Sequence, residues 1–406
     1  MNLNETVYYS ALINNHDSKT SNASTLSEPH LTFNEIRDNP IIKNCQDYKL
    51  AIINFKLDTK SLPVFIPVIE YDGSGKNKST TIYTVFFEYL GYSGFQNVLF
   101  KPQDETIDRP IMKNGYADYS NGYYNYYNYE PFLTDVNRAV VDAFNQLEYS
   151  INMQEEGQDI KNDFNIFKNA AGKFEVPQFI YDKDTKLIFM NAPKRQFNDD
   201  IANGNFIKIF LNEPLYRLFN SLPFKKQHIP FKFYSSETKL LTNTNPFVVF
   251  RLNLNNFKNS NEIEIYPKLD DNTVSTTKST HLIIYQDYET LSSWSPVDSI
   301  VFTSNSIPVR STVVSANHSY DNGVETTEGS SNSIALEICE FRAGLFTPGV
   351  IYEPSVLRWI DMYDQDELCR ININIYYKLK YTGQLIPFRI NNGGSFSIKM
   401  AFQKIK

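Results

Sequence analysis

The segment that begins at Arg370 alternates apolar and polar side chains in two separate runs, and this alternation constrains the fold more than any other feature. The first run covers residues 370–379 and the second covers residues 395–402. The side chains that share one face in these runs are Ile371, Ile373 and Ile375, and then Phe396, Ile398, Met400 and Phe402. Successive side chains of a strand point to opposite faces, so a period of two predicts half-buried strands of an antiparallel sheet.

Strand-like runs continue through the rest of the C-terminal half. Residues 381–394 supply a middle strand with two glycine-bearing turns, and further candidate strands begin at about residue 231. Loops rich in Ser, Thr and Asn separate these strands, and the longest covers residues 305–332. Many strands joined by some long crossing loops predict a Greek-key sandwich or a jelly roll rather than a meander.

The N-terminal half also contains strand-like segments, but helical patterns interrupt them. Apolar side chains recur at helical spacing in residues 131–147, which predicts one long helix. Residues 214–222 predict a second, short helix that ends before Pro223. Within the long helix, Asp135 and Arg138 have the spacing to pair on the exposed side.

The predicted fold is therefore mainly β. We expect an antiparallel jelly-roll sandwich in the C-terminal half, and a second β-rich half, which could itself be a jelly roll, with one or two helices. The predicted domains are residues 1–227, a β-rich domain with helical insertions, and residues 228–406, a jelly-roll-like β-sandwich.

Composition and charge indicate a folded protein that does not bind nucleic acid directly. Of the 406 residues, 41% are hydrophobic and 15% are aromatic, which is sufficient for a large core and argues against global disorder. The net charge is −7 and neither end carries a basic arm, so we expect no direct contact with a genome. The sequence shows no secretory signal and no run of about 18 apolar residues, so we expect no membrane span.

Motifs that assemble catalytic chemistry are missing from the sequence. The Gly73-Ser-Gly-Lys76 stretch resembles a phosphate-binding loop, but Asn77 stands where a Ser or Thr would bind magnesium. The five histidines are scattered and no Gly-x-Ser-x-Gly elbow occurs. We therefore predict a protein that is not an enzyme, with no catalytic residues, cofactor or metal, while a glycosidase with two carboxylates stays open as an alternative.

The densest acidic stretch is a possible exception to the absence of a metal site. Asp361, Asp364, Asp366 and Glu367 could offer oxygens to a calcium ion, although their spacing does not match an EF-hand loop. The alternative is a solvated turn that precedes the strand at Arg370. We favour the turn.

Tyrosine is concentrated between residues 115 and 129. Tyrosines interleaved with Asn, Ser and Gly are typical of adaptable recognition surfaces, but they also occur where rings simply pack against a sheet or a neighbouring subunit. The candidate interaction residues are Tyr123, Tyr124, Tyr126 and Tyr127. If the loop is a recognition surface, the chain would be a receptor- or carbohydrate-binding module of the fibre or lectin type.

Several stretches resemble jelly-roll capsid proteins of small icosahedral DNA viruses, in the virophage and Polinton-like group. Residues 298–309, 355–361 and 383–406 carry most of the resemblance, and residues 132–137 and 209–215 add to it. The resemblance implies a structural capsid protein that self-assembles into an icosahedral shell. It would be a homo-oligomer, trimer or pentamer, in contact with copies of itself and other capsid proteins.

The same resemblance places the protein in the virion capsid, after assembly inside the host cell. The chain is long for a bare single jelly roll and short for many double jelly-roll coat proteins. The sequence therefore leaves open whether it is a major coat protein or a penton or minor capsid protein.

Overall fold

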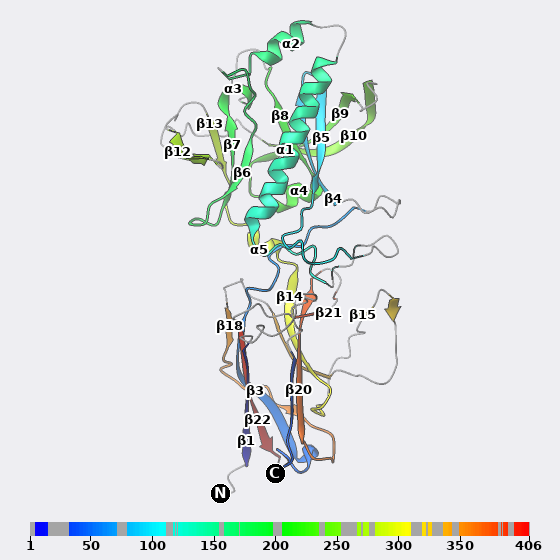
Figure 1. Ribbon diagram of the computed structural model, residues 1–406, viewed down its shortest axis with the longest axis vertical. Helices are drawn as coiled ribbons and strands as arrows, with labels where there is room; N and C mark the ends of the chain where they lie inside the picture. The colour runs from blue at the N-terminus through cyan, green and yellow to red at the C-terminus, as the bar shows by residue number, and fades with distance from the viewer. Residues whose placement is uncertain are drawn as a thin grey trace.

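The computed structural model shows an elongated molecule with two lobes stacked along its long axis (Figure 1). The structure describes residues 5–14, 32–70, 79–110, 117, 119, 121–153, 158–169, 171–197, 205–234, 240–252, 266–268, 271–275, 281–309, 319–321, 324–326, 336–342, 349–380, 383, 385–388 and 394–405. The stretch at 73–76 and most of the long loop at 305–332 therefore lie outside the described residues. We call the part that contains both ends of the chain the lower lobe and the other part the upper lobe.

The lower lobe is a sandwich of two antiparallel five-stranded sheets. The first sheet has the order β1 (Thr6–Asn14), β22 (Ser395–Lys404), β3 (Tyr48–Asp58) and β18 (Gly349–Tyr352), with β19 (Ile360–Asp361) also on β3. The second sheet has the order β17 (Leu336–Arg342), β14 (Val297–Ser304), β20 (Arg370–Leu379) and β2 (Thr32–Ile36), with β21 (Leu385–Pro387) also on β20.

The strands of the lower lobe pair in a nested order. If the short strands β19 and β21 are set aside, eight strands remain. Along the chain, the first of these pairs with the last (β1 with β22), and the second with the second last (β2 with β20). The third pairs with the third last (β3 with β18), and β14 and β17 pair in the middle. This nested antiparallel order makes the lobe a jelly-roll-like sandwich. The mainly β prediction is confirmed.

The sequence predicted a sandwich in the C-terminal half, but the sandwich also contains strands from the N-terminal end. Its strands β1, β2 and β3 come from the N-terminal end, and the predicted division after residue 227 falls inside a strand, β9 (Phe224–Tyr234). Alternation of apolar and polar residues defines the buried face of a strand, but it does not identify the strand that lies beside it. The strands of the sandwich thus come from both sides of the predicted boundary.

The core of the sandwich follows the alternation of the C-terminal strands. Ile371, Ile373 and Ile375 of β20 and the apolar set of β22 all point inward and are buried. The rings of Phe55 and Phe302 lie 5.0 Å apart, and those of Phe302 and Phe396 lie 5.8 Å apart. These aromatic contacts join the two sheets across the core.

The upper lobe is an insertion between β3 and β14. Its main sheet closes into a barrel in the order β10 (Leu240–Leu252), β8 (Lys208–Asn212), β4 (Thr80–Tyr89), β5 (Tyr92–Leu99) and β9. A smaller sheet has the order β13 (His281–Tyr285), β7 (Ile188–Pro193) and β6 (Gln178–Tyr181). A two-stranded piece pairs β11 (Tyr266–Lys268) with β12 (Asp271–Ser275). A second one, β15 (Ser319–Asp321) with β16 (Val324–Thr326), lies outside this insertion, in the connection from β14 to β17 of the lower lobe.

One long helix, α1 (Tyr129–Asn152), lies along the strands of the upper lobe and packs against β5 and β4 (Figure 1). It begins where the side chain of Asn128 accepts a hydrogen bond from the backbone N–H of Glu130. The long helix predicted from residues 131–147 is confirmed. The short predicted helix is α4 (Glu213–Leu218), whereas α2 (Gln158–Asn165), α3 (Lys194–Phe197) and α5 (Leu291–Trp294) were missed.

Gly94 of β5 is the point of closest approach between the barrel and α1. A Cβ atom at this position would lie 2.1 Å from the carbonyl oxygen of Ala143 and 2.3 Å from the backbone nitrogen of Leu147. Both atoms belong to the helix backbone, which cannot move aside as a flexible side chain could. The absence of a side chain at Gly94 therefore allows α1 to lie flat on the sheet.

Gly94→Ala is expected to lower the free energy of unfolding by about 3 kcal/mol, because the added methyl group forces α1 away from β5. Chemical denaturation followed by circular dichroism would measure the loss. The matched control is Gly349→Ala in β18, where the nearest atom lies 3.6 Å away and no loss is expected. An unchanged denaturation midpoint for Gly94→Ala would contradict the close packing of α1.

Candidate assembly surfaces

The tyrosine-rich segment belongs mainly to the core of the upper lobe. Tyr124 and Tyr126 are completely buried, Tyr123 is half-buried, and Tyr127 is exposed. The ring of Phe100 lies 5.2 Å from that of Tyr124 and 5.4 Å from that of Tyr126. Two of the four candidate interaction residues are therefore packed inside the chain, which leaves only Tyr123 and Tyr127 of the four to contact another molecule.

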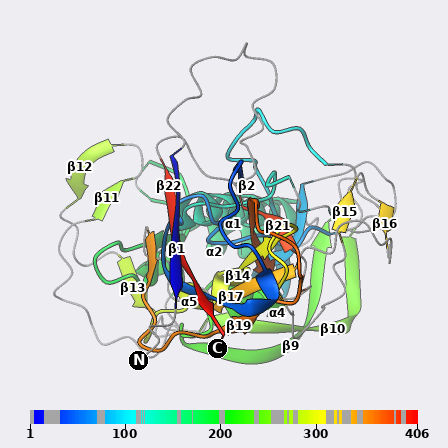
Figure 2. The same ribbon diagram turned by 90° about the horizontal axis from the view of Figure 1, so that it is seen from below.

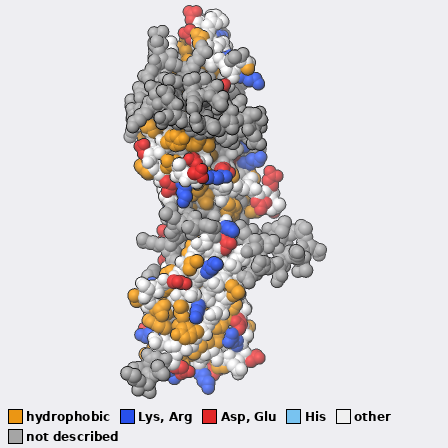
Figure 3. Space-filling model, turned by 90° about the vertical axis from the view of Figure 1, so that its left-hand side faces the viewer, with side chains coloured by type: hydrophobic (Ala, Val, Ile, Leu, Met, Phe, Trp, Pro, Cys, Tyr) orange, Lys and Arg blue, Asp and Glu red, His pale blue; other side chains and the backbone are white. Residues whose placement is uncertain are grey.

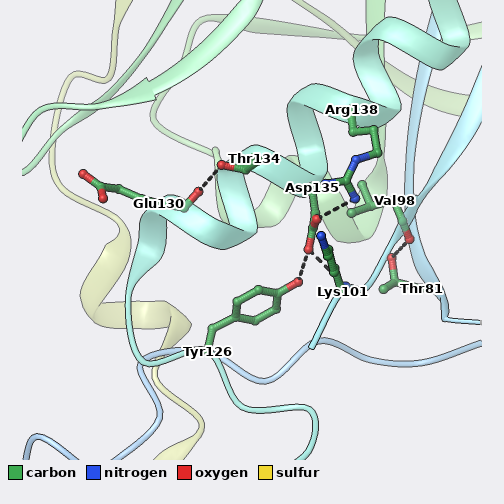
Figure 4. Close-up of polar contacts among 8 residues, drawn as sticks. All are labelled: Thr81, Val98, Lys101, Tyr126, Glu130, Thr134, Asp135 and Arg138. Carbon is green, nitrogen blue, oxygen red and sulfur yellow. Dashed lines mark hydrogen bonds and ion pairs between the residues drawn. The ribbon is translucent and has the colours of Figure 1, made fainter. Parts of the chain in front are cut away.

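Tyr126 also takes part in a buried polar network at the start of α1 (Figure 4). Its hydroxyl donates to Oδ2 of Asp135 at 2.6 Å, and the backbone N–H of Lys101 donates to the same oxygen at 3.2 Å. Arg138 donates to Oδ1 of Asp135 at 3.0 Å. The predicted pair of Asp135 and Arg138 is thus confirmed, but Asp135 is buried and only Arg138 is exposed.

Burial decides the titration of this network. It raises the pKa of Asp135 above the ordinary range, although the donors Tyr126, Arg138 and Lys101 act in the opposite direction. Burial, together with the charge of Asp135, also raises the pKa of the Tyr126 hydroxyl far above its ordinary value. Tyr126 therefore stays a hydrogen-bond donor, and its role is to fix the segment to α1.

The acidic side chains of residues 361–367 make separate local contacts. Asp361 pairs with Lys49 at 3.4 Å, and Oδ1 of Asp364 accepts the backbone N–H of Asp366 at 3.2 Å. Glu367 is exposed. Among the residues that the structure describes, no three His, Cys, Asp or Glu side chains gather as metal ligands would.

The backbone of the same stretch supports a short 3-10 turn, Cys45–Asp47. The carbonyl oxygen of Asp364 accepts the N–H of Gln46 at 2.6 Å, and that of Asp366 accepts the N–H of Cys45 at 3.3 Å. The described contacts are those of the turn that we favoured from the sequence.

The outer face of the first sheet carries unpartnered apolar side chains. Tyr8, Leu12 and Ile351 are 62%, 63% and 66% exposed, although each lies in a regular strand. Figure 3 views the molecule from the side of this sheet and shows hydrophobic side chains gathered on the lower lobe. We call this set of three residues, Tyr8, Leu12 and Ile351, the apolar wall.

The register of the strands places two members of the apolar wall at the ends of one row, with polar side chains between them. Leu12 lies opposite Ser397 of β22, which lies opposite Lys56 of β3, which in turn lies opposite Ile351 of β18. Leu12 and Ile351 therefore occupy one row that crosses the whole sheet. Exposed apolar patches on a folded domain mark surfaces of interaction.

A polar cluster joins the two sheets beside the wall. The hydroxyl of Tyr9 in β1 donates a short hydrogen bond to Oε2 of Glu35 in β2, and Arg37 donates to Oε1 of Glu35 at 2.8 Å. The guanidinium of Arg37 also lies 5.3 Å from the centre of the Tyr9 ring. This cluster connects the edge strands of the first and second sheets, and so closes one side of the sandwich.

Comparison with known proteins identifies the family of this chain. A family model described as Sputnik minor capsid protein V18/19 matches residues 7–404. The chain belongs to this family. It is also 30% identical over 149 residues to an uncharacterized protein, V18, of the Sputnik virophage, a match that spans 35% of this chain and 84% of that protein.

Solved structures show the same fold. The chain is similar to a chain of the 3.5 Å cryo-EM structure of the Sputnik virophage, with a TM-score of 0.69, 20% identity and 98% of each chain covered. It is also similar to the mavirus penton protein, with a TM-score of 0.53, 14% identity, and 99% of this chain and 100% of that chain covered. At these identities, the two likenesses concern the fold.

As a member of the Sputnik minor capsid protein V18/19 family, the chain has a structural role in a capsid and is a component of a virion. The resemblance that the sequence suggested is confirmed. In the described part of the chain, no helix has the length and apolar character needed to cross a bilayer.

Sequence reasoning missed the apolar wall of this capsid protein. The signal was present in β1, because a strand that buries Tyr9 and Ala11 must turn Tyr8 and Leu12 to the opposite face. The sequence analysis recognised strands but did not ask what their outward faces would meet.

Tyr126→Phe is expected to lower the free energy of unfolding by about 1.5–3 kcal/mol, because it removes a buried donor from Asp135. Tyr127→Phe, four-tenths exposed at the same segment, is the control and should cost less. Denaturation of both variants under the same conditions gives the comparison. Equal losses would mean that the Tyr126–Asp135 hydrogen bond has no special weight.

Glu35→Gln is expected to weaken the sandwich at pH 7 but not in acid. The Tyr9 hydroxyl, and then Arg37, hold the pKa of Glu35 below its ordinary value. The carboxylate therefore stabilises the native state fully at pH values above the ordinary glutamate pKa of about 4.3. That stabilisation is lost as the pH falls through the lower, folded-state pKa. The difference from the wild type should therefore shrink below about pH 4 in denaturation curves measured from pH 3 to pH 7.

The control for this experiment is Glu353→Gln, an exposed residue of the same lobe, which should change the stability little at any pH. A difference between wild type and Glu35→Gln that stays constant with pH would show that the carboxylate charge is not what Tyr9 and Arg37 recognise.

Proposed function

We propose that this chain is a penton-type subunit that packs side by side with copies of itself into a closed ring of five, without enzymatic activity. In this ring, the jelly-roll-like lower lobes form the shell and the upper lobes project from it. The observation that carries the proposal is the apolar wall, which lies on the side of the lower lobe and not at its end.

The charges of the wall favour a ring over a two-fold dimer. Lys56 and Lys399 lie on the same face as Leu12 and Ile351, and neither forms an ion pair with a carboxylate in the part of the chain that the structure describes. A two-fold contact would bring this face against itself and place like charges together. A contact with a different surface of the neighbour avoids this repulsion, and such head-to-tail contacts close into rings.

The likeness to the mavirus penton protein supports the same arrangement, because the match covers 99% of this chain and 100% of that one. A single sandwich also fits a subunit that occupies one position in a ring. The major coat alternative would place this one sandwich where many coat proteins carry two.

Leu12→Asp and Ile351→Asp, made separately, test the wall. Burying either side chain in an interface is worth about 1.5–3 kcal/mol, so each charge should weaken ring formation at least tenfold. Native mass spectrometry and analytical ultracentrifugation would report the change as a loss of five-copy particles in favour of single chains.

The matched control is Ile166→Asp, which charges an exposed apolar residue of the upper lobe and should leave the particles intact. A wild-type protein that stays a single chain at high concentration, over a range of salt, would refute self-assembly through the wall. A mass of three copies would refute the ring of five.

A further inference from the structure

Among the residues that the structure describes, the backbone of β1 has one row of hydrogen-bonding groups without a strand partner. The backbone N–H of Lys404 donates to the carbonyl oxygen of Glu5, and directly opposite residues in an antiparallel pair exchange both bonds. The residues of β1 at odd numbers therefore bond to β22. Tyr8, Ser10 and Leu12 consequently direct their N–H and C=O groups to the outer edge, because β1 is the terminal strand of its sheet.

This edge lacks the devices that usually protect sheet edges. β1 has nine residues, pairs with β22 without a register shift, and contains no proline and no charged side chain. Tyr8, Ser10 and Leu12 are all exposed. The other edge of this sheet, β18, is only four residues long. At the neighbouring edge of the second sheet, β2 carries the charged Glu35, which pairs with Arg37 directly after the strand.

A cation stands beside the edge. Lys399 of β22 lies opposite Ser10, and its ammonium is 5.4 Å from the centre of the Tyr8 ring. Within the described residues, Lys399 has no carboxylate partner. Because Ser10 is small, the space between Lys399 and a strand added to β1 is open to a longer side chain on that strand.

We propose that the edge of β1 binds an extended segment of a neighbouring capsid protein as an added strand, and that this segment carries a carboxylate between two apolar residues. The carboxylate lies opposite Ser10 and pairs with Lys399. The apolar residues lie opposite Tyr8 and Leu12 and extend the apolar wall by one strand. Main-chain hydrogen bonds supply the affinity, and the Lys399 pair supplies the selectivity.

The charge beside the edge argues for a different protein over a second copy of this chain. A second β1 would present its own uncharged edge and would leave both Lys399 ammonium groups without a partner. A carboxylate on an acidic segment pairs with the ammonium of Lys399, which it reaches across the small side chain of Ser10.

The test uses the full-length protein and two synthetic ten-residue peptides of alternating Val and Thr that differ at one central position, Glu or Lys. Fluorescence anisotropy of labelled peptides measures binding. We expect the Glu peptide to bind at least tenfold more tightly than the Lys peptide. Lys399→Met should remove most of this difference while leaving the weaker peptide's binding nearly unchanged.

Hydrogen exchange identifies the edge in the wild-type protein. The bound Glu peptide should slow exchange at the amides of Tyr8, Ser10 and Leu12 and leave those of Tyr9 and Ala11, which already bond to β22, unchanged. Protection elsewhere, or none, would overturn the proposal, as would equal affinity for the two peptides.

Ser10→Pro removes the outward N–H at the centre of the row without breaking a bond to β22, since proline is accepted at edge positions that face solvent. It should abolish peptide binding and preserve the ring of five. The experiment therefore distinguishes a failure of the added-strand proposal from a failure of the ring proposal. Loss of self-association in Ser10→Pro, with no peptide binding by the wild type, would assign the edge to a second copy instead.

Discussion

The pairing of β1 with β22 is the constraint on which the rest of the molecule depends. It places the two ends of the described chain side by side at the far end of the lower lobe (Figure 2). Once the first and last strands are neighbours, the strands between them must return in nested order, and two facing sheets result. The upper lobe then leaves and re-enters at one place, between β3 and β14, so that a long insertion disturbs no pair of the sandwich.

The two lobes have separate cores with little in common. One apolar cluster fills the sandwich and another surrounds α1, and the half-buried Ile66 packs against both. Because the cores are separate, the aromatic residues of the tyrosine segment pack in the core of the upper lobe. A lobe that projects from a shell needs its own core, and Phe65, Tyr126 and Trp294 provide part of it by ring contacts around Phe132.

Sequence patterns revealed the faces of elements but not their neighbours. The inward sets of β20 and β22 and the buried stripe of α1 could be read directly, because each repeats with the period of its element. The partnership of β1 with β22 could not be read, since it joins residues at opposite ends of the chain and rests on backbone bonds that every residue type except proline can make. The acidic turn at Asp364 was ambiguous for a related reason: its described contacts to Cys45 and Gln46 are made by carbonyl oxygens, which carry no signature in the sequence.

β1 contributes to the structure of this shell protein in three ways. Its inward side chains, Tyr9 and Ala11, complete the core, and Tyr9 also holds Glu35 of the opposite sheet. Its outward side chains contribute to the apolar wall, and its outer backbone groups form an edge that no other described strand covers. Strand geometry assigns each side chain of β1 either to the core or to the wall. A substitution that improved one of these three functions by adding charge or bulk would therefore damage another. The absence of charge in β1 follows from this conflict: a charge on the inward face would be buried, and a charge on the outward face would stand in the contact with a neighbour.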